Sequence, residues 1–163
     1  MVIQANTRML LIRYCNYKKL SFIDEHRKVL SKEGFVWMMR LGKTINPQKI
    51  QDVLDDGGHL ILKAPKKDGD QYYICRFTSI SDKLPEGGLY SPKYYVELIR
   101  EEQFVDSSFQ FFRVISITPI PKEELDKLTL QLNGKKVNTV VKETRTSFMY
   151  VQNDKVMTFE EGM

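Results

Sequence analysis

Short apolar runs separated by polar turns dominate the first half of the chain. The run Met9–Tyr14 is almost entirely apolar, and Gly34–Lys43, His59–Ala64 and Gln71–Ile80 follow it with large or β-branched side chains. Runs of this length, bounded by turn residues, are typical of buried strands. The Asp-Gly pair at 68–69 predicts that the last two runs form a β-hairpin.

Two helices are predicted between these strands. Ser21 is placed to cap the first, whose apolar residues keep helical spacing over Phe22–Lys32 until Gly34 allows a left-handed stop. Asn46 is placed to cap the second, over Pro47–Asp56, because proline is favoured at a first helical position.

The second half of the chain is more mixed. Residues 81–93 carry two prolines and two glycines, which predicts a long loop. Helices are predicted over Pro121–Leu128 and Val137–Glu143. The predicted strands are Tyr94–Arg100, Phe109–Ile117, Ser147–Gln152 and Lys155–Phe159.

Strands and helices do not alternate strictly along this order. We therefore expect an α+β fold, a partly closed β-barrel of about six strands flanked by short helices, because many short strands must hide their edges. The expected organisation is a loose N-terminus at 1–8, a single domain at 9–159 and a tail at 160–163.

Composition narrows the function classes without naming one. The 163 residues include 25 basic and 21 acidic side chains, for a net charge of +4, which permits a polyanionic partner. No apolar run is long enough to span a membrane, and no signal-peptide pattern is present. Cys15 and Cys75 are too few for a disulfide framework. We expect a cytoplasmic protein that does not contact membranes, and its oligomeric state stays open.

Signals of catalysis are weak. Gly42-Lys43-Thr44 resembles the end of a phosphate-binding loop, but Trp37 occupies the position where that loop needs its first glycine. His26 and His59 do not belong to a metal-ligand spacing. We therefore predict no catalytic residue, no metal and no cofactor.

Signals of binding are stronger. Trp37, the one tryptophan, is either a core residue or the wall of a pocket that stacks on a flat ligand. Tyr90, Tyr94 and Tyr95 fall in or beside a proline-anchored loop, which suits a recognition surface. Cations occupy expected loop positions, where only a cluster around an aromatic pocket would contact phosphates: Lys18, Lys19, Arg40, Lys43, Lys66, Lys67 and Lys93.

The order of these pieces resembles the EVE branch of the PUA-like superfamily, to which YTH and ASCH domains are related. The resemblance rests on the Gly34-Phe35 and Gly42-Lys43 pairs that bound a strand, and on a layout of short segments along 9–152. Those segments are Cys75–Ile80, Tyr90–Leu98, Pro121–Leu128 and Ser147–Val151. In place of the paired arginines common in EVE domains, this chain has Lys93-Tyr94-Tyr95.

The resemblance implies a non-enzymatic module that binds DNA or RNA and holds a modified base, methylated by preference, in an aromatic pocket. It also implies a setting in prokaryotic restriction or defence. The residues it points to for the base pocket are Trp37, Tyr14, Tyr90, Tyr94, Asn16 and Ser147. Those it points to for phosphate contacts are Lys18, Lys19, Arg40, Lys43 and Lys93.

Two alternatives remain open. One is a small ASCH-like enzyme acting on nucleosides or amides, for which Lys43, Thr44 and either Glu33 or Glu97 are available. The other is a protein-interaction module accessory to a defence or toxin system.

Overall fold

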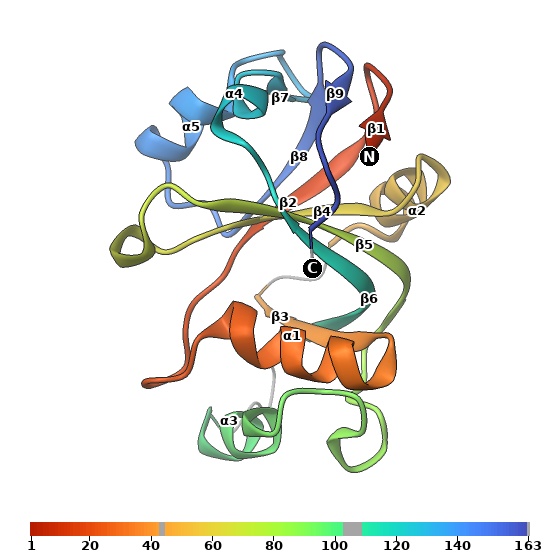
Figure 1. Cartoon of the computed structure of the whole chain (residues 1–163), viewed down its shortest axis with the longest axis vertical. Coiled ribbons are helices and arrows are strands. Elements are labelled where there is room, and N and C mark those ends of the chain that lie inside the picture. The colour runs from red at the N-terminus through yellow and green to blue at the C-terminus, as the bar shows by residue number, and fades with distance from the viewer. Residues whose placement is uncertain (43–44, 103–108, 163) are drawn as a thin grey trace.

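The main sheet has seven strands and curls into a half-barrel between short helices, so the α+β class is confirmed (Figure 1). The computed structural model describes residues 1–42, 45–102 and 109–162. Across the sheet the order is β3-β6-β5-β4-β2-β8-β7. The strand bounds are β2 Met9–Arg13, β3 Val36–Leu41, β4 His59–Lys63, β5 Tyr72–Ser81, β6 Phe109–Pro119, β7 Leu128–Leu130 and β8 Phe148–Asn153.

Helices pack on both faces of this sheet. Their bounds are α1 Phe22–Glu33, α2 Pro47–Asp55, α3 Tyr94–Glu102, α4 Lys122–Leu125 and α5 Val137–Glu143. The first two begin as predicted, because the Ser21 side chain accepts from the Asp24 N–H and the Asn46 side chain accepts from the Gln48 N–H. No helix in the described part of the chain is long and apolar enough to cross a membrane.

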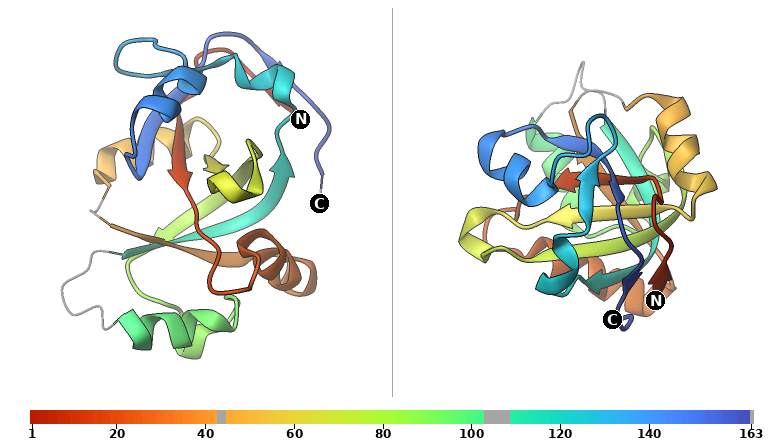
Figure 2. Two further views of the ribbon diagram at one scale, coloured as in Figure 1. Left: turned by 90° about the vertical axis from the view of Figure 1, so that its left-hand side faces the viewer. Right: turned by 90° about the horizontal axis from the view of Figure 1, so that it is seen from above.

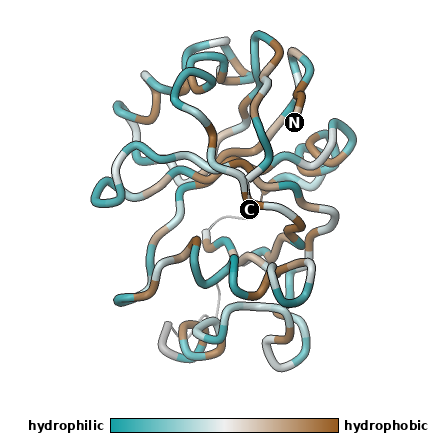
Figure 3. Tube along the Cα trace, in the orientation of Figure 1, coloured by the Kyte–Doolittle hydropathy of each residue, from teal (hydrophilic) through white to brown (hydrophobic). Residues whose placement is uncertain are grey.

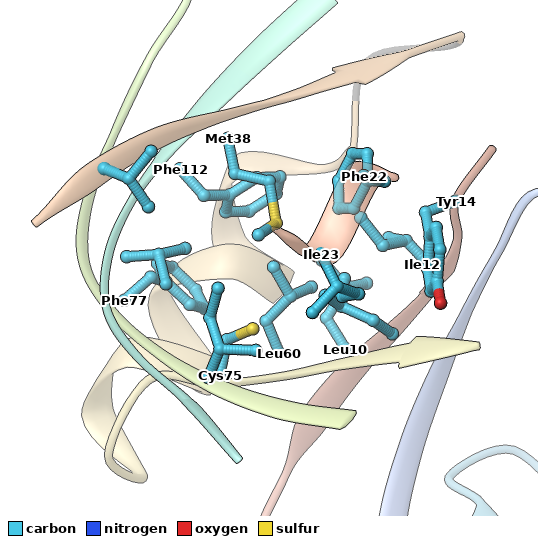
Figure 4. Close-up of a cluster of buried hydrophobic side chains, with 14 of the residues drawn as sticks. Leu10, Ile12, Tyr14, Phe22, Ile23, Met38, Leu60, Cys75, Phe77 and Phe112 are labelled. Atoms are coloured by element: carbon cyan, nitrogen blue, oxygen red, sulfur yellow. The ribbon is translucent and has the colours of Figure 1, made fainter. Parts of the chain in front are cut away.

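The central strands β2 and β4 are buried on both faces, which explains their continuous apolar runs. In β2, Leu10 and Ile12 face the inside of the half-barrel, where they pack with α1 and α2 (Figure 4). We refer to this cluster as the inner core. Met9 and Leu11 point the other way, into a second core under α4 and α5. Figure 3 shows hydrophobic colour on the central strands and hydrophilic colour on the outer loops. Because successive strand side chains alternate between faces, one strand serves two cores.

A third core, which we refer to as the α3 core, lies between α3 and the outer face of β3 and β6. Tyr94 and Tyr95 of α3 pack there against Met39 and Phe111, with Trp37 partly buried at the edge. The prediction of a strand over Tyr94–Arg100 was therefore wrong. The segment is a helix because Tyr94, Tyr95, Leu98 and Ile99 recur at helical spacing, which turns these four residues toward β3 and β6.

The N-terminal residues are tied down, so the expectation of a loose segment at 1–8 was also wrong. Val2–Ile3 form β1, which pairs with β9 (Met157–Thr158) in a separate two-stranded sheet. Asn153, fully buried, donates through Nδ2 to the carbonyls of Ile3 and Gln4, and its Oδ1 accepts from the Thr7 N–H. This network brings the two ends of the chain together (Figure 2).

Candidate functional site

A cavity of about 430 Å³ opens where the carboxyl ends of β2 and β3 meet the start of β8 and the first turn of α3. The loop that follows β2 and the first residue of α1 complete its wall. Its aromatic lining residues are Tyr14, Tyr17, Phe22, Tyr94 and Tyr95, and its basic ones are Arg13, Arg40 and Arg145. Its other polar lining residues are Cys15, Asn16 and Ser147. We refer to this cavity as the aromatic pocket.

Two ring stacks form its walls. Tyr14 stacks on Phe22 with ring centres 4.8 Å apart, and both rings lie at one edge of the inner core (Figure 4). Tyr17 stacks on Tyr94 at 5.0 Å with only 12° between the ring planes. Because each ring is already held by a neighbour, a flat ligand meets rigid apolar faces at little cost in conformational entropy.

A buried hydrogen-bond chain holds the rear of the pocket. His26 is fully buried, and its Nδ1–H donates to the Phe22 carbonyl, so its Nε2 accepts from the hydroxyl of Tyr95. The Tyr95 oxygen in turn accepts from the Met39 N–H at 2.8 Å. Burial lowers the pKa of His26 to about 4, so the imidazole stays neutral at physiological pH.

Arg13 organises the rim opposite these rings. Its guanidinium donates to the carbonyls of Val141 and Thr144 at 2.9 and 2.7 Å, and to that of Thr146 at 3.1 Å. The Arg13 N–H also donates to the Ser147 carbonyl at 3.1 Å. Arg13 thus fixes the segment that carries Arg145, whose exposed side chain reaches the pocket.

Arg40 joins two distant parts of the sheet at the pocket. It lies in β3, at one end of the strand order, yet its guanidinium carbon is 4.5 Å from the centre of the Phe148 ring in β8. It also donates to the Ser147 Oγ at 3.4 Å. Arg40 is only 4% exposed, and burial lowers its pKa. Arg40 therefore connects β3 with the start of β8, and the pocket lies next to this contact.

The charged side chains that line the pocket all have the same sign in the described part of the chain. None of the described residues that line it is acidic, while three are arginines. Asn16 sits at the edge with both ends of its amide engaged, since Nδ2 donates to Asp68 and Oδ1 accepts from the Phe22 N–H. A ligand that bonds to the Asn16 Nδ2 would have to share it with Asp68.

Five of the residues predicted for the site line this pocket: Tyr14, Asn16, Tyr94, Ser147 and Arg40. Trp37 packs against the α3 core and does not line the aromatic pocket. Tyr90 and Lys93 line a separate hollow beside α1. Lys18 forms an exposed ion pair with Glu97 at 3.0 Å.

Two further cations are predicted beside the pocket, Lys19 and Lys43. Lys19 is exposed but does not line it, and Lys43 lies outside the described residues. The sequence reasoning missed Tyr17, Arg13 and Arg145. The first of these had a local signal, because Tyr17 belongs to the same short loop as the predicted Tyr14 and Asn16.

No match was found when the chain was compared with protein-family models, with curated proteins and with solved structures. Within the described residues, no three His, Cys, Asp or Glu side chains gather as a metal site would require.

Proposed function

We propose that the protein is a PUA-like module that binds DNA or RNA and holds one unpaired base in the aromatic pocket. The observation that carries this proposal is one cavity with two ring stacks, three arginines and no acidic side chain among its described lining residues. Aromatic faces bind any base by stacking, and arginines favour the adjacent phosphates.

The size and the lining of the pocket support this proposal. Its volume of about 430 Å³ is within the range of cavities that enclose small organic ligands. The side chains of Met39 and Leu98 supply an apolar niche beside the rings. A methyl group on the base would gain on the order of 1 kcal/mol by burial there. This is the basis on which we extend the proposal to a methylated base.

The proposal is tested by titrating the protein into short fluorescein-labelled single-stranded oligonucleotides, DNA and RNA, with plain and methylated bases. Fluorescence anisotropy at low salt measures the affinity. Replacing Tyr17 by Ala removes one ring of a stack without opening the inner core, and we expect about 5- to 150-fold weaker binding, the value of one stacked base. Tyr90→Ala, which removes an exposed tyrosine outside the pocket, serves as the matched control.

Cys15 offers a second readout on the unmodified protein. Its thiol is exposed and lines the pocket, whereas Cys75 is buried and burial raises the pKa of its thiol. A bound oligonucleotide should slow the reaction of Cys15 with a disulfide reagent, because the base covers the thiol. If no oligonucleotide binds even at low salt, the proposed function is wrong. If binding occurs without protecting Cys15 and is unaffected by Tyr17→Ala, the base lies elsewhere.

The enzymatic alternative has less support in this pocket. Glu33 and Glu97, the two carboxylates available to it, do not line the cavity, and Lys43 and Thr44 lie outside the described residues. Incubating the protein with modified nucleosides and following their mass would reveal any turnover, which a binding module does not produce.

A further inference from the structure

A second hollow, of about 710 Å³, adjoins the aromatic pocket. The two cavities share Arg13 and Arg145 in their linings, so they lie next to each other on either side of these arginines. The second hollow is bounded by the ends of β2 and β4, the start of β5, and the helices α4 and α5. We refer to it as the basic hollow.

Its lining concentrates positive charge. The basic residues are Arg13, Lys63, Lys66, Lys122, Lys142 and Arg145, against the acidic Asp70, Asp126 and Glu143. With Arg40 of the aromatic pocket, the two linings hold seven of the 25 basic residues and three of the 21 acidic ones. Among the described residues, the excess of four positive charges in these two linings equals the net charge of +4 of the whole sequence.

Lys63 shows that this charge is poorly compensated inside the protein. It is 8% exposed, and its register partner on β2 is Arg13. Its Nζ donates to the Ala64 carbonyl at 3.3 Å and lies 5.6 Å from the centre of the Tyr72 ring. Burial, with Arg13 and Lys66 nearby, lowers the pKa of Lys63, although Asp70 opposes the shift. A bound anion would stabilise this ammonium group.

We infer that the basic hollow binds the sugar–phosphate backbone of a single-stranded nucleic acid, next to the nucleotide whose base occupies the aromatic pocket. This inference rests on the proposed function, and it adds the path by which the chain of the ligand leaves the pocket. The path would run from the aromatic pocket past Arg13 and Arg145, which line both cavities, into the basic hollow. Four of the cations, Lys66, Lys122, Lys142 and Arg145, have exposed side chains that can reach phosphates without disturbing the core.

The test compares the salt dependence of oligonucleotide binding in two double variants. Lys66→Gln with Lys142→Gln removes two exposed cations from the basic hollow. Lys83→Gln with Lys155→Gln removes the same charge from exposed lysines that line neither cavity. Each phosphate contact on a single strand contributes about 0.7 to the slope of log K against log salt, so the first pair should flatten the slope by about 1.4. The control pair should leave the slope unchanged.

The outcomes separate this inference from the function on which it rests. If Tyr17→Ala weakens binding but both double variants keep the parent slope, the backbone does not lie in the basic hollow and the base pocket stands. If the parent binds no labelled single strand at all, the proposed function fails first. If polyglutamate displaces the oligonucleotide as effectively as an unlabelled strand of equal charge does, the hollow is a general polyanion surface and the inference is overturned.

Discussion

The aromatic pocket and the surface around Trp37 are built from the same residue types but arranged differently. At the Trp37 surface, formed by Phe35, Trp37, Tyr90 and Arg113, the Phe35 ring lies 4.7 Å from that of Tyr90 and 4.0 Å from the Arg113 guanidinium carbon. The Trp37 N–H donates to the Tyr90 carbonyl at 2.8 Å. At this surface the arginine and the rings therefore contact each other directly.

In the aromatic pocket the rings instead stack in pairs, and both pairs border an open cavity. Tyr14 is backed by Phe22, and Tyr17 is stacked with Tyr94, so each pair borders the cavity. An aromatic residue next to an arginine is therefore not by itself a binding signal. What distinguishes a site is whether the contacts that hold the rings leave open space next to them.

The largest difference between the two regions should appear in stability. Phe22 is 6% exposed and belongs to the inner core, so Phe22→Ala should lower the free energy of unfolding by about 3–5 kcal/mol. Phe35 is half-buried, and Phe35→Ala should cost about 1 kcal/mol. Urea unfolding followed by circular dichroism measures both. Equal losses would mean that the pocket wall is not part of the core.

The rear of the pocket should also respond to pH. The pKa of His26 is lowered from 6.5 to about 4 by burial, so the unfolded chain binds the proton more readily than the folded one. Stability should therefore be full above pH 6.5 and decrease as the pH falls toward 4, by about 3 kcal/mol in total. The measurement is urea unfolding at a series of pH values. His26→Gln, which does not titrate, should make this part of the pH profile flatter.

His59 provides the control for that experiment. Its pKa is also lowered to about 4, first by burial and then by Arg76, but it does not line or back the pocket. His59→Gln should remove a separate share of the same pH dependence. Asp56 and Asp154 have pKa values below 3.8 and so act at lower pH. A profile unchanged by His26→Gln would contradict the buried neutral imidazole.

The smallest effect is expected from the tryptophan. Trp37→Phe keeps an aromatic ring against the α3 core and should lower the free energy of unfolding by about 1 kcal/mol. Oligonucleotide affinity, measured by anisotropy, should stay at the parent value, because Trp37 does not line the pocket. A loss of affinity as large as that of Tyr17→Ala would move the base to the Trp37 surface.

Most strands and the first two helices could be predicted because their signals are local. Alternation and apolar runs mark β2 to β6, and cap residues mark α1 and α2. The third helix was mistaken for a strand because Tyr94, Tyr95 and Val96 favour strands individually. The contrary signal was the spacing of Tyr94 and Tyr95 from Leu98 and Ile99, which places all four on one helical face.

Five residues of the site could be predicted one by one, but the meeting of those that are distant in the sequence could not. Tyr14 and Asn16 follow a recognisable strand, but the meeting of Arg40 with Ser147 depends on how far the sheet curls. Trp37 and Met39 lie on the same face of β3, because side chains two residues apart in a strand point the same way. Of the two, Met39 lines the pocket and Trp37 does not. No pattern in the sequence indicates where such a curl ends.

The pairing of β1 with β9 has a practical consequence. The Met1 amino group donates to the Phe159 carbonyl at 2.8 Å, so the two ends meet beyond the amino end of β2, while the pocket opens at the carboxyl end of that strand. A strand of five residues separates them by about 17 Å. A label, a surface tether or a fused protein attached at either end would leave the mouth of the pocket unobstructed. Immobilised protein should therefore bind as well as free protein does.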